Sequence, residues 1–254
     1  MITAILLAGG IGSRLGQDIP KQYIKVAQRT IFSYSLETLS KSDKIDAIWI
    51  VADKTWHYLI QKDIRKYDIK HKVKGFSQPG VNRQLSIYQA MIDLKAKAKN
   101  DDFVFIHDAV RPLLTLKDIQ EYVLAIEEYD GVVPVLPMKD TVYLSLDGKT
   151  LTSRLNRSQV VAGQAPEIFA FQKYLDAVEN LIHWINTSDG QVISLESEIF
   201  KINGSAEPAV MAQMNLRIVE GNEENFKITT PMDLDRFIEI MEGNQYESLG
   251  FRRY

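Results

Sequence analysis

Short apolar runs alternate with amphipathic segments along the first half of the chain. The runs are too short for buried helices and predict buried strands at Ile2–Leu7, Ala47–Val51, Phe103–Ile106 and Val132–Leu136. Apolar residues at three- and four-residue spacings predict helices over Thr30–Leu39, Thr55–Tyr67, Asn82–Lys95 and Leu116–Glu127, with Thr30 and Asn82 as candidate N-caps. This alternation predicts an α/β fold with a mostly parallel sheet, helices on both faces, and ligands beyond the carboxyl ends of the strands.

The alternation stops after Leu136. Two strand-like segments, Thr141–Leu146 and Thr150–Leu155, flank the hairpin dipeptide Asp147-Gly148. Because a two-stranded ribbon is marginally stable alone, we expect an arm over about residues 138–160 that packs on the body or on another subunit. The remaining pattern predicts a helix at Phe171–Ile185, a turn at Thr187–Gly190, a strand at Leu216–Val219 and a final helix at Met232–Met241. We expect a single domain over residues 1–254.

Composition excludes several classes of function. The chain has no cysteine, which excludes disulfides, thiolate nucleophiles and cysteine metal sites. Its net charge of −3 gives no basic face for nucleic acid or for an anionic membrane. No apolar run approaches the roughly 18 residues of a membrane span, and the apolar start lacks the basic region of a signal peptide. We expect a cytoplasmic protein that binds neither nucleic acid nor membrane.

The richest candidate site directly follows the first predicted strand. Three small residues in a row, Ala8 to Gly10, and then Gly12 lead to Arg14, and Lys21 follows shortly after. Small residues let backbone N–H groups approach a ligand, and two neighbouring cations suit a polyphosphate. The spacing fits neither the P-loop nor the dinucleotide fingerprint, because Gly16 comes one residue late for the latter. The alternative is a glycine-rich turn with solvated basic residues.

Two further segments carry chemistry at predicted element ends. Asp108 follows a buried strand, where a carboxylate can hold a metal ion or a ribose hydroxyl; the alternative is a helix cap or a salt bridge to Arg111. His107 is interpreted as a structural histidine. The turn at Gly80 enters a helix whose N-terminus can bind an anion or a base edge, or the segment is an ordinary helix cap.

Taken in order, these motifs resemble the cytidylyltransferase family that includes the methylerythritol-phosphate enzyme of isoprenoid synthesis and the ribitol-5-phosphate enzymes of teichoic acid and capsule synthesis. The motifs are Ala8 to Arg14, Pro20-Lys21-Gln22, His107 to Pro112, Asp140-Thr141 and Lys227 to Pro231. The resemblance spans nearly the whole chain. It implies a Rossmann-like nucleotidyltransferase fold whose protruding β-arm forms a homodimer and completes the acceptor site across subunits.

The resemblance also implies a role for each motif residue. Catalytic cations around the triphosphate would be Arg14, Lys21 and Lys227. Nucleotide-binding residues would be Leu7, Ala8, Gly9, Gly10, Gly12, Gly80, Arg83, Ser86, Asp108 and Ala109, with Gly80 and Ser86 at the cytosine. Acceptor-binding residues would be Arg111, Thr141 and Arg157. Asp108 would also lie at the ribose and at Mg²⁺ or another divalent cation. The acceptor phosphate would attack the α-phosphorus of CTP, and as a dianion it needs no general base.

Departures from the family pattern concern the acceptor. The methylerythritol-phosphate enzymes usually carry Thr-Pro-Gln where this chain has Ala165-Pro166-Glu167. A later Thr-Asp-(Asp/Glu)-Ala-Ser run is replaced by Ser194–Glu198, where the ribitol enzymes also usually keep an aspartate. Val110 and Ser86-Ile87 are nearer the ribitol branch, and Val81 replaces a common acidic residue.

These departures favour D-ribitol 5-phosphate or a related polyol phosphate as the acceptor, giving a CDP-polyol for cell-surface polymer. The alternatives are the methylerythritol-phosphate activity, a UTP- or GTP-dependent nucleotide-sugar enzyme, and a catalytically silent nucleotide-binding protein. The last is disfavoured because Arg14, Lys21, Asp108 and Lys227 are all retained.

Overall fold

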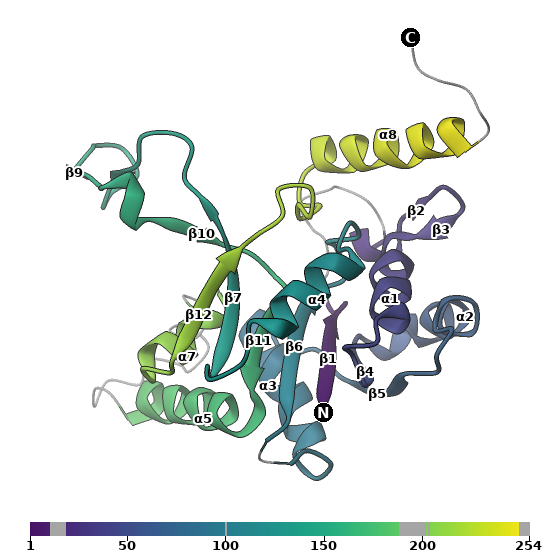
Figure 1. The fold of residues 1–254 in the computed structure, drawn as a ribbon, viewed down its shortest axis with the longest axis horizontal. Coiled ribbons are helices and arrows are strands. Elements are labelled where there is room, and N and C mark those ends of the chain that lie inside the picture. Colours follow the sequence, from purple (N-terminus) through teal and green to yellow (C-terminus); the bar gives the residue numbers. More distant parts are fainter. Residues whose placement is uncertain (11–18, 100, 188–201, 203, 249–254) are drawn as a thin grey trace.

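The fold is built on a mixed central sheet (Figure 1). The computed structural model describes residues 1–10, 19–99, 101–187, 202 and 204–248. Within these residues the sheet has eight strands in the order β10-β7-β11-β6-β1-β4-β5, with β12 also paired to β7. The strands are β1 (Ile2–Leu7), β4 (Ala47–Val51), β5 (Val73–Ser77), β6 (Phe103–Asp108), β7 (Gly131–Pro137), β10 (Val161–Gly163), β11 (Glu167–Ala170) and β12 (Leu216–Glu220).

The first half of the chain forms the expected parallel unit. β1 pairs in parallel with both β4 and β6, and β4 pairs in parallel with β5. The predicted strands at Ile2–Leu7 and Ala47–Val51 are confirmed, and β6 continues as far as Asp108. β5 was not predicted because, as the edge strand, it is only partly buried and has no continuous apolar run. The carboxyl ends of β1 and β6 consequently lie side by side.

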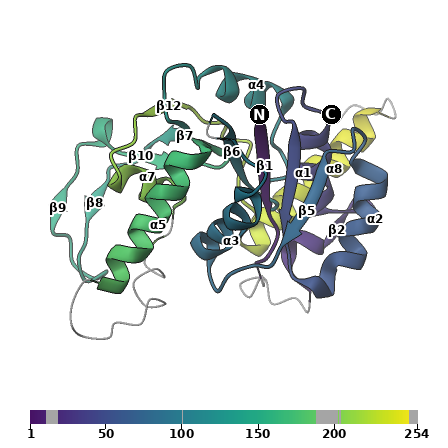
Figure 2. The same ribbon diagram turned by 90° about the horizontal axis from the view of Figure 1, so that it is seen from below.

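Helices cover both faces of the sheet, as predicted (Figure 2). They are α1 (Ile31–Lys41), α2 (His57–Tyr67), α3 (Arg83–Lys95), α4 (Leu116–Leu124), α5 (Phe171–Thr187), α7 (Ala206–Met211) and α8 (Pro231–Ser248). The predicted N-caps are confirmed, because Thr30 accepts from the amide of Ser33 and Asn82 from that of Leu85. The helix expected from Thr55 begins instead as the 3₁₀ turn η3 (Lys54–Trp56), capped by Asp53.

Neighbouring residues of β1 pack on opposite faces. Leu6 packs with Phe32 and Leu36 of α1, whereas Ile5 packs with Ile87 of α3 and other residues on the second face. Successive side chains of a strand point to opposite faces of the sheet. A strand that is covered on both faces therefore needs apolar residues at consecutive positions. A third cluster joins α8 to the β2–β3 hairpin (Lys25–Val26 and Arg29–Thr30). Among the described residues, no helix is long and apolar enough to cross a membrane.

The second half of the sheet is not parallel throughout. β11 lies between β6 and β7 and is antiparallel to both, and β10 is antiparallel to β7. β11 was missed because it has four residues and directly follows Pro166. β12 matches the predicted strand at Leu216 and is parallel to β7. The predicted turn beginning at Thr187 falls largely outside the described residues.

The predicted arm projects from the ends of β7 and β10 (Figure 1). It contains β8 (Tyr143–Leu144), β9 (Ser153–Arg154) and the 3₁₀ turn η4 (Arg157–Gln159). The hairpin is confirmed, but the expected six-residue strands are wrong, because β8 and β9 each have two residues. Asp147 and Gly148 belong to a wider loop in which the Asp147 carboxylate accepts from the amides of Lys149 and Thr150. These side-chain bonds replace a two-residue turn.

Candidate active site

A cavity of about 350 Å³ opens beyond the carboxyl ends of β1 and β6. It is lined by Leu7, Gly9, Gly10, Lys21, Gln22, Gly80, Val81, Asn82, Arg83, Ser86, Asp108, Val110 and Lys227. Most of the nucleotide-binding residues expected from the sequence therefore meet at one place. It is also the edge of the sheet where ligands of α/β folds bind.

The beginning of the glycine loop is anchored by the 3₁₀ turn η2 (Lys21–Tyr23). The side-chain amide of Gln22 donates to the carbonyls of Ala8 and Gly10, at 2.7 and 2.8 Å, and the Tyr23 hydroxyl donates to Ala8 at 3.0 Å. Gln22 and Tyr23 are buried, which fixes η2 beside β1 and brings Lys21 to the cavity wall. Gly12 and Arg14 lie outside the described residues.

The opposite wall is the turn that enters α3. The hydroxyl of Ser86 donates to the carbonyl of Asn82 at 2.7 Å and accepts from the amide of Gly80 at 3.0 Å. The helix-cap interpretation of this segment is confirmed by the Asn82 cap, and the same segment also lines the cavity. A Cβ atom on Gly80 would lie 2.7 Å from the backbone carbon of Leu85, so the close turn requires glycine.

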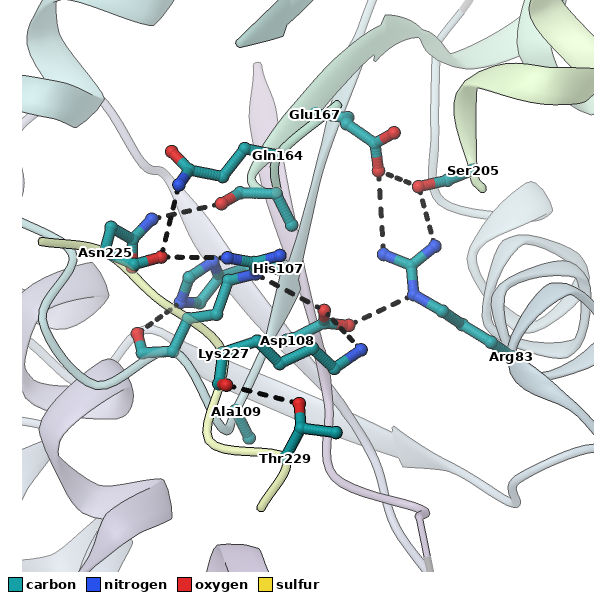
Figure 3. Close-up of polar contacts among 12 residues, drawn as sticks. Arg83, His107, Asp108, Ala109, Gln164, Glu167, Ser205, Asn225, Lys227 and Thr229 are labelled. Carbon is teal, nitrogen blue, oxygen red and sulfur yellow. Dashed lines mark hydrogen bonds and ion pairs between the residues drawn. The ribbon is translucent and has the colours of Figure 1, made fainter. Parts of the chain in front are cut away.

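Asp108 is the acidic centre of the site (Figure 3). Its carboxylate lies 3.1 Å from Nε of Arg83, 3.0 Å from Nζ of Lys227 and 3.6 Å from Nε of Arg111. Burial alone would raise the pKa of Asp108, but these three cations outweigh it and hold that pKa well below its usual range. Asp108 is therefore ionised. It forms the salt bridge to Arg111 that was one interpretation from the sequence, and it also lines the cavity, as the other interpretation requires.

Arg111 and His107 lie behind Asp108 rather than among the lining residues. Arg111 donates through Nη1 to the carbonyl of Asn225 at 2.8 Å, and its own carbonyl lies 3.1 Å from Nε2 of His107. His107 is fully buried, and that burial lowers its pKa to about 4, so the ring is neutral. This agrees with its interpretation as a structural histidine.

Arg83 has each nitrogen directed at a different partner. Besides Nε at Asp108, its Nη1 donates to the hydroxyl of Ser205 at 2.8 Å, and its Nη2 lies 3.6 Å from the carboxylate of Glu167. Burial raises the pKa of Glu167 to about 7, although Arg83 opposes that shift. Sequence reasoning missed both partners as site residues. The signal for Glu167 was the altered Ala165-Pro166-Glu167 segment, whereas Ser205 gave none.

Other expected site residues occupy supporting positions. The amide of Ala109 donates to the carbonyl of Leu7, and the amide of Ala8 donates to the carbonyl of Val51. The two alanines therefore join the ends of neighbouring strands beneath the cavity. Thr141 and Arg157 are exposed on the arm and do not line the cavity of their own chain. Arg157 donates through Nη1 to the carbonyl of Lys139 at 2.6 Å.

The charges of the cavity suit a polyanion. The described lining residues include three cationic side chains, Lys21, Arg83 and Lys227, and one carboxylate, Asp108. Cations fixed in a partly dehydrated pocket stabilise developing negative charge on transferred phosphoryl groups, and they need no nucleophilic side chain. In the part of the chain that the structure describes, no three His, Asp or Glu side chains cluster so as to hold a metal ion by themselves.

Comparison with known proteins gives a consistent result. The family model described as "IspD: 2-C-methyl-D-erythritol 4-phosphate cytidylyltransferase" matches residues 2–242. A ribitol-5-phosphate cytidylyltransferase of Lacticaseibacillus paracasei is 31% identical over 93% of this chain and 96% of its own. A 2-C-methyl-D-erythritol 4-phosphate cytidylyltransferase of Petrotoga mobilis is 30% identical over 92% and 96%. The solved 4-diphosphocytidyl-2C-methyl-D-erythritol synthase of Anaerococcus prevotii is 25% identical, with a TM-score of 0.71 over 95% and 96% of the two chains.

Proposed function

The chain belongs to the IspD family and is a CTP-dependent cytidylyltransferase, and from this premise we propose that it transfers CMP to D-ribitol 5-phosphate or a related polyol phosphate. Pyrophosphate leaves, and the product is a CDP-polyol, an activated precursor for cell-surface polymer. The observation that carries the proposal is the pairing of Lys227 with Asp108, in a cavity at the carboxyl ends of β1 and β6 that Lys21 also lines.

The chemistry needs positioning and charge neutralisation rather than an activated side chain. A phosphate monoester has a second pKa of about 6, so the acceptor is largely dianionic at neutral pH and attacks without a general base. Its oxygen forms a bond to the α-phosphorus of CTP as the bond to the β-phosphate oxygen breaks. Lys21 and Lys227 offset the charge that develops on the phosphates, and Asp108 orients the ribose.

The donor set fits a Mg²⁺ ion that arrives with the nucleotide. Mg²⁺ is usually bound through one or two carboxylates together with substrate phosphates and water. Asp108 is the carboxylate of the described cavity lining, so it would hold the ion jointly with the triphosphate. When bound, the ion supplies further neutralisation of the leaving pyrophosphate.

Gly9 and Gly10 offer a matched pair of substitutions. A Cβ on Gly9 would lie 2.4 Å from Cβ of Pro79, whereas a Cβ on Gly10 meets no atom of the described residues within 4 Å. We expect Gly9→Ala to lower the free energy of unfolding by about 1–3 kcal/mol, because the site is already filled. Gly10→Ala should leave the Tm unchanged and raise the KM for CTP about tenfold, because Gly10 lines the cavity and an added methyl takes up space beside the nucleotide. Thermal unfolding and steady-state kinetics separate the two effects. An unchanged KM for CTP in Gly10→Ala would contradict the binding of the nucleotide at this loop.

The altered segment Ala165-Pro166-Glu167 supports a polyol phosphate as the acceptor. It lies beside the nucleotide pocket, because Glu167 contacts Arg83, and its sequence departs from the Thr-Pro-Gln usual in methylerythritol-phosphate enzymes. The relatives of known name include both activities at nearly equal identity. Methylerythritol phosphate is therefore the second candidate acceptor.

Pyrophosphate release tests the acceptor. The pure protein is incubated with CTP and Mg²⁺ against ribitol 5-phosphate, other pentitol and hexitol phosphates, glycerol 3-phosphate and methylerythritol phosphate. Release with a polyol phosphate supports the proposal. Release with methylerythritol phosphate alone assigns the protein to isoprenoid synthesis, and tight CTP binding without release from any acceptor favours a silent nucleotide-binding protein.

We further propose that the arm forms a homodimer and carries Thr141 and Arg157 to the partner's pocket. The tip of the arm exposes large apolar side chains, with Leu146 80% and Leu151 70% exposed. Two large apolar side chains exposed together at the end of a projecting arm are typical of an interface. Leu146→Asp with Leu151→Asp should lower the mass in solution from twice 29.0 kDa to 29.0 kDa and reduce turnover. Val210→Asp, at an exposed position on α7, is the matched control. A wild-type protein that sedimented as a monomer would contradict the proposal.

A further inference from the structure

A buried carboxylate lies behind the nucleotide pocket and does not line it. Glu167 is the first residue of β11, is 6% exposed, and is separated from the cavity by Arg83. Carboxylates are seldom this buried without a specific partner. Glu167 has three, because the hydroxyl of Ser205 donates to the same oxygen that faces Nη2 of Arg83, and the amide of Ala206 also donates to the carboxylate.

The contacts form a continuous chain from Glu167 to the acidic centre of the site (Figure 3). Ser205 accepts from Nη1 of Arg83 and donates to Glu167, so its hydroxyl bridges the two charged groups. The third nitrogen of Arg83, Nε, lies 3.1 Å from Asp108. Glu167 and Ser205 thus hold one edge of the guanidinium, and Asp108 contacts the other.

Geometry gives this arrangement a consequence for Asp108. An arginine and a carboxylate pair preferentially through two parallel N–H···O bonds. Arg83 instead presents Nε to Asp108 while Nη1 and Nη2 are directed at Ser205 and Glu167. We propose that Glu167 is a positioning residue, which through Ser205 draws the guanidinium of Arg83 away from a two-nitrogen pairing and so keeps Asp108 directed at the substrates. The inference rests on the proposed function only in assigning substrates to this pocket.

Glu167 is held in this position at a cost in stability. The charged and polar groups around it come from each packed element: Arg83 on α3, Asp108 on β6 with Arg111 after it, the neutral Tyr174 hydroxyl on α5 and the amide of Ala206 on α7. Burial outweighs the arginines and raises the pKa of Glu167 to about 7. When folding raises the pKa of a carboxyl, the folded protein becomes less stable as the pH rises from the pKa of that carboxyl in the unfolded chain towards its pKa in the folded protein, here about 7. A neutral side chain of the same shape should therefore make the protein more stable above that range.

Glu167→Gln tests the proposal, because it keeps the shape and an acceptor oxygen but removes the charge. At pH 8 we expect kcat for pyrophosphate release to fall about tenfold, the KM for CTP not to rise, and the Tm to exceed that of the wild type. The gain in Tm should be largely absent at pH 5. An unchanged kcat, or a fall in kcat together with a higher KM and a lower Tm, would overturn the proposal in favour of no role or a structural one.

Two further variants complete the experiment. Ser205→Ala removes the bridging hydroxyl and retains both charges, so kcat should fall about threefold with no gain in Tm. An unaltered kcat in Ser205→Ala would also count against the positioning chain. Glu37→Gln is the matched control, since Glu37 pairs with Arg29 at 2.6 Å on α1, outside the cavity lining. Its pKa is lowered by its partners, so Glu37→Gln should lower the Tm and leave kcat unchanged.

The assay uses whichever acceptor phosphate the wild-type protein turns over. Turnover with methylerythritol phosphate alone would refute the proposed acceptor and leave the comparison of variants intact. The Tm measurements need no acceptor.

Discussion

We expect Lys21→Ala to lower turnover at least 100-fold while the protein stays folded. Lys21 lines the cavity from η2, which Gln22 and Tyr23 fix to the end of β1 through hydrogen bonds to Ala8. The backbone of η2 is therefore held at the cavity wall, and we propose that the Lys21 ammonium group neutralises charge where it develops on the phosphates. A 100-fold loss corresponds to about 2.7 kcal/mol of transition-state stabilisation. Steady-state pyrophosphate release at saturating CTP measures the effect.

Lys25→Ala is the control for Lys21→Ala. Lys25 is exposed on β2 a few residues away and is not among the lining residues, so its loss changes the net charge equally and leaves kcat within twofold. Lys21→Arg should recover part of the activity, because the charge is kept with a different shape. Near-normal turnover in Lys21→Ala would remove this residue from the mechanism.

Asp108→Asn should damage both stability and activity. Asp108 is 6% exposed and balances Arg83, Arg111 and Lys227. Removing one partner of a buried ion pair leaves an uncompensated charge, which costs about 3–5 kcal/mol. Turnover should fall at least 100-fold, because the carboxylate that we propose orients the ribose is lost and the surrounding cations repel one another. Urea unfolding and pyrophosphate release measure the two effects.

The pH dependence separates this role from general destabilisation. Because the pKa of Asp108 in the folded protein lies well below its ordinary value, its contribution to stability is complete above about pH 4 and is lost at lower pH. The difference in unfolding free energy between wild type and Asp108→Asn should therefore shrink as the pH falls below about 4. Asp43→Asn, at an exposed carboxylate paired with Lys70, should leave the Tm unchanged. A difference of the same size at pH 3 would contradict the ion-pair account.

The central strands could be predicted from the sequence because both of their faces are covered. β1 and β4 are continuous apolar runs, and Asp108 marks the carboxyl end of β6 at the edge where ligands bind. The edge strand β5 and the short antiparallel β11 carry no such run, since exposure and length remove the pattern. The continuous apolar runs that burial on two faces requires, rather than strand propensity, allowed the central strands to be predicted.

The site was predictable where one chain segment carries the chemistry and not where distant segments meet. Lys21, Asp108 and Lys227 lie in distinct motifs and converge as expected. The pairing of Arg83 with Ser205 joins residues 122 positions apart, and no local pattern encodes it. The interpretation of Arg83 as a nucleotide ligand is refined accordingly, because its nitrogens face Asp108, Ser205 and Glu167 from the cavity wall.

Direct competition between acceptors tests the central claim most sharply. Equal concentrations of D-ribitol 5-phosphate and methylerythritol phosphate are supplied together with limiting CTP and Mg²⁺, and the two CDP products are separated and quantified by mass spectrometry. The product ratio equals the ratio of the two values of kcat/KM, so differences in protein concentration or stability cancel. We predict CDP-ribitol in at least 100-fold excess. An excess of the methylerythritol product would contradict the account and assign this pocket to isoprenoid synthesis.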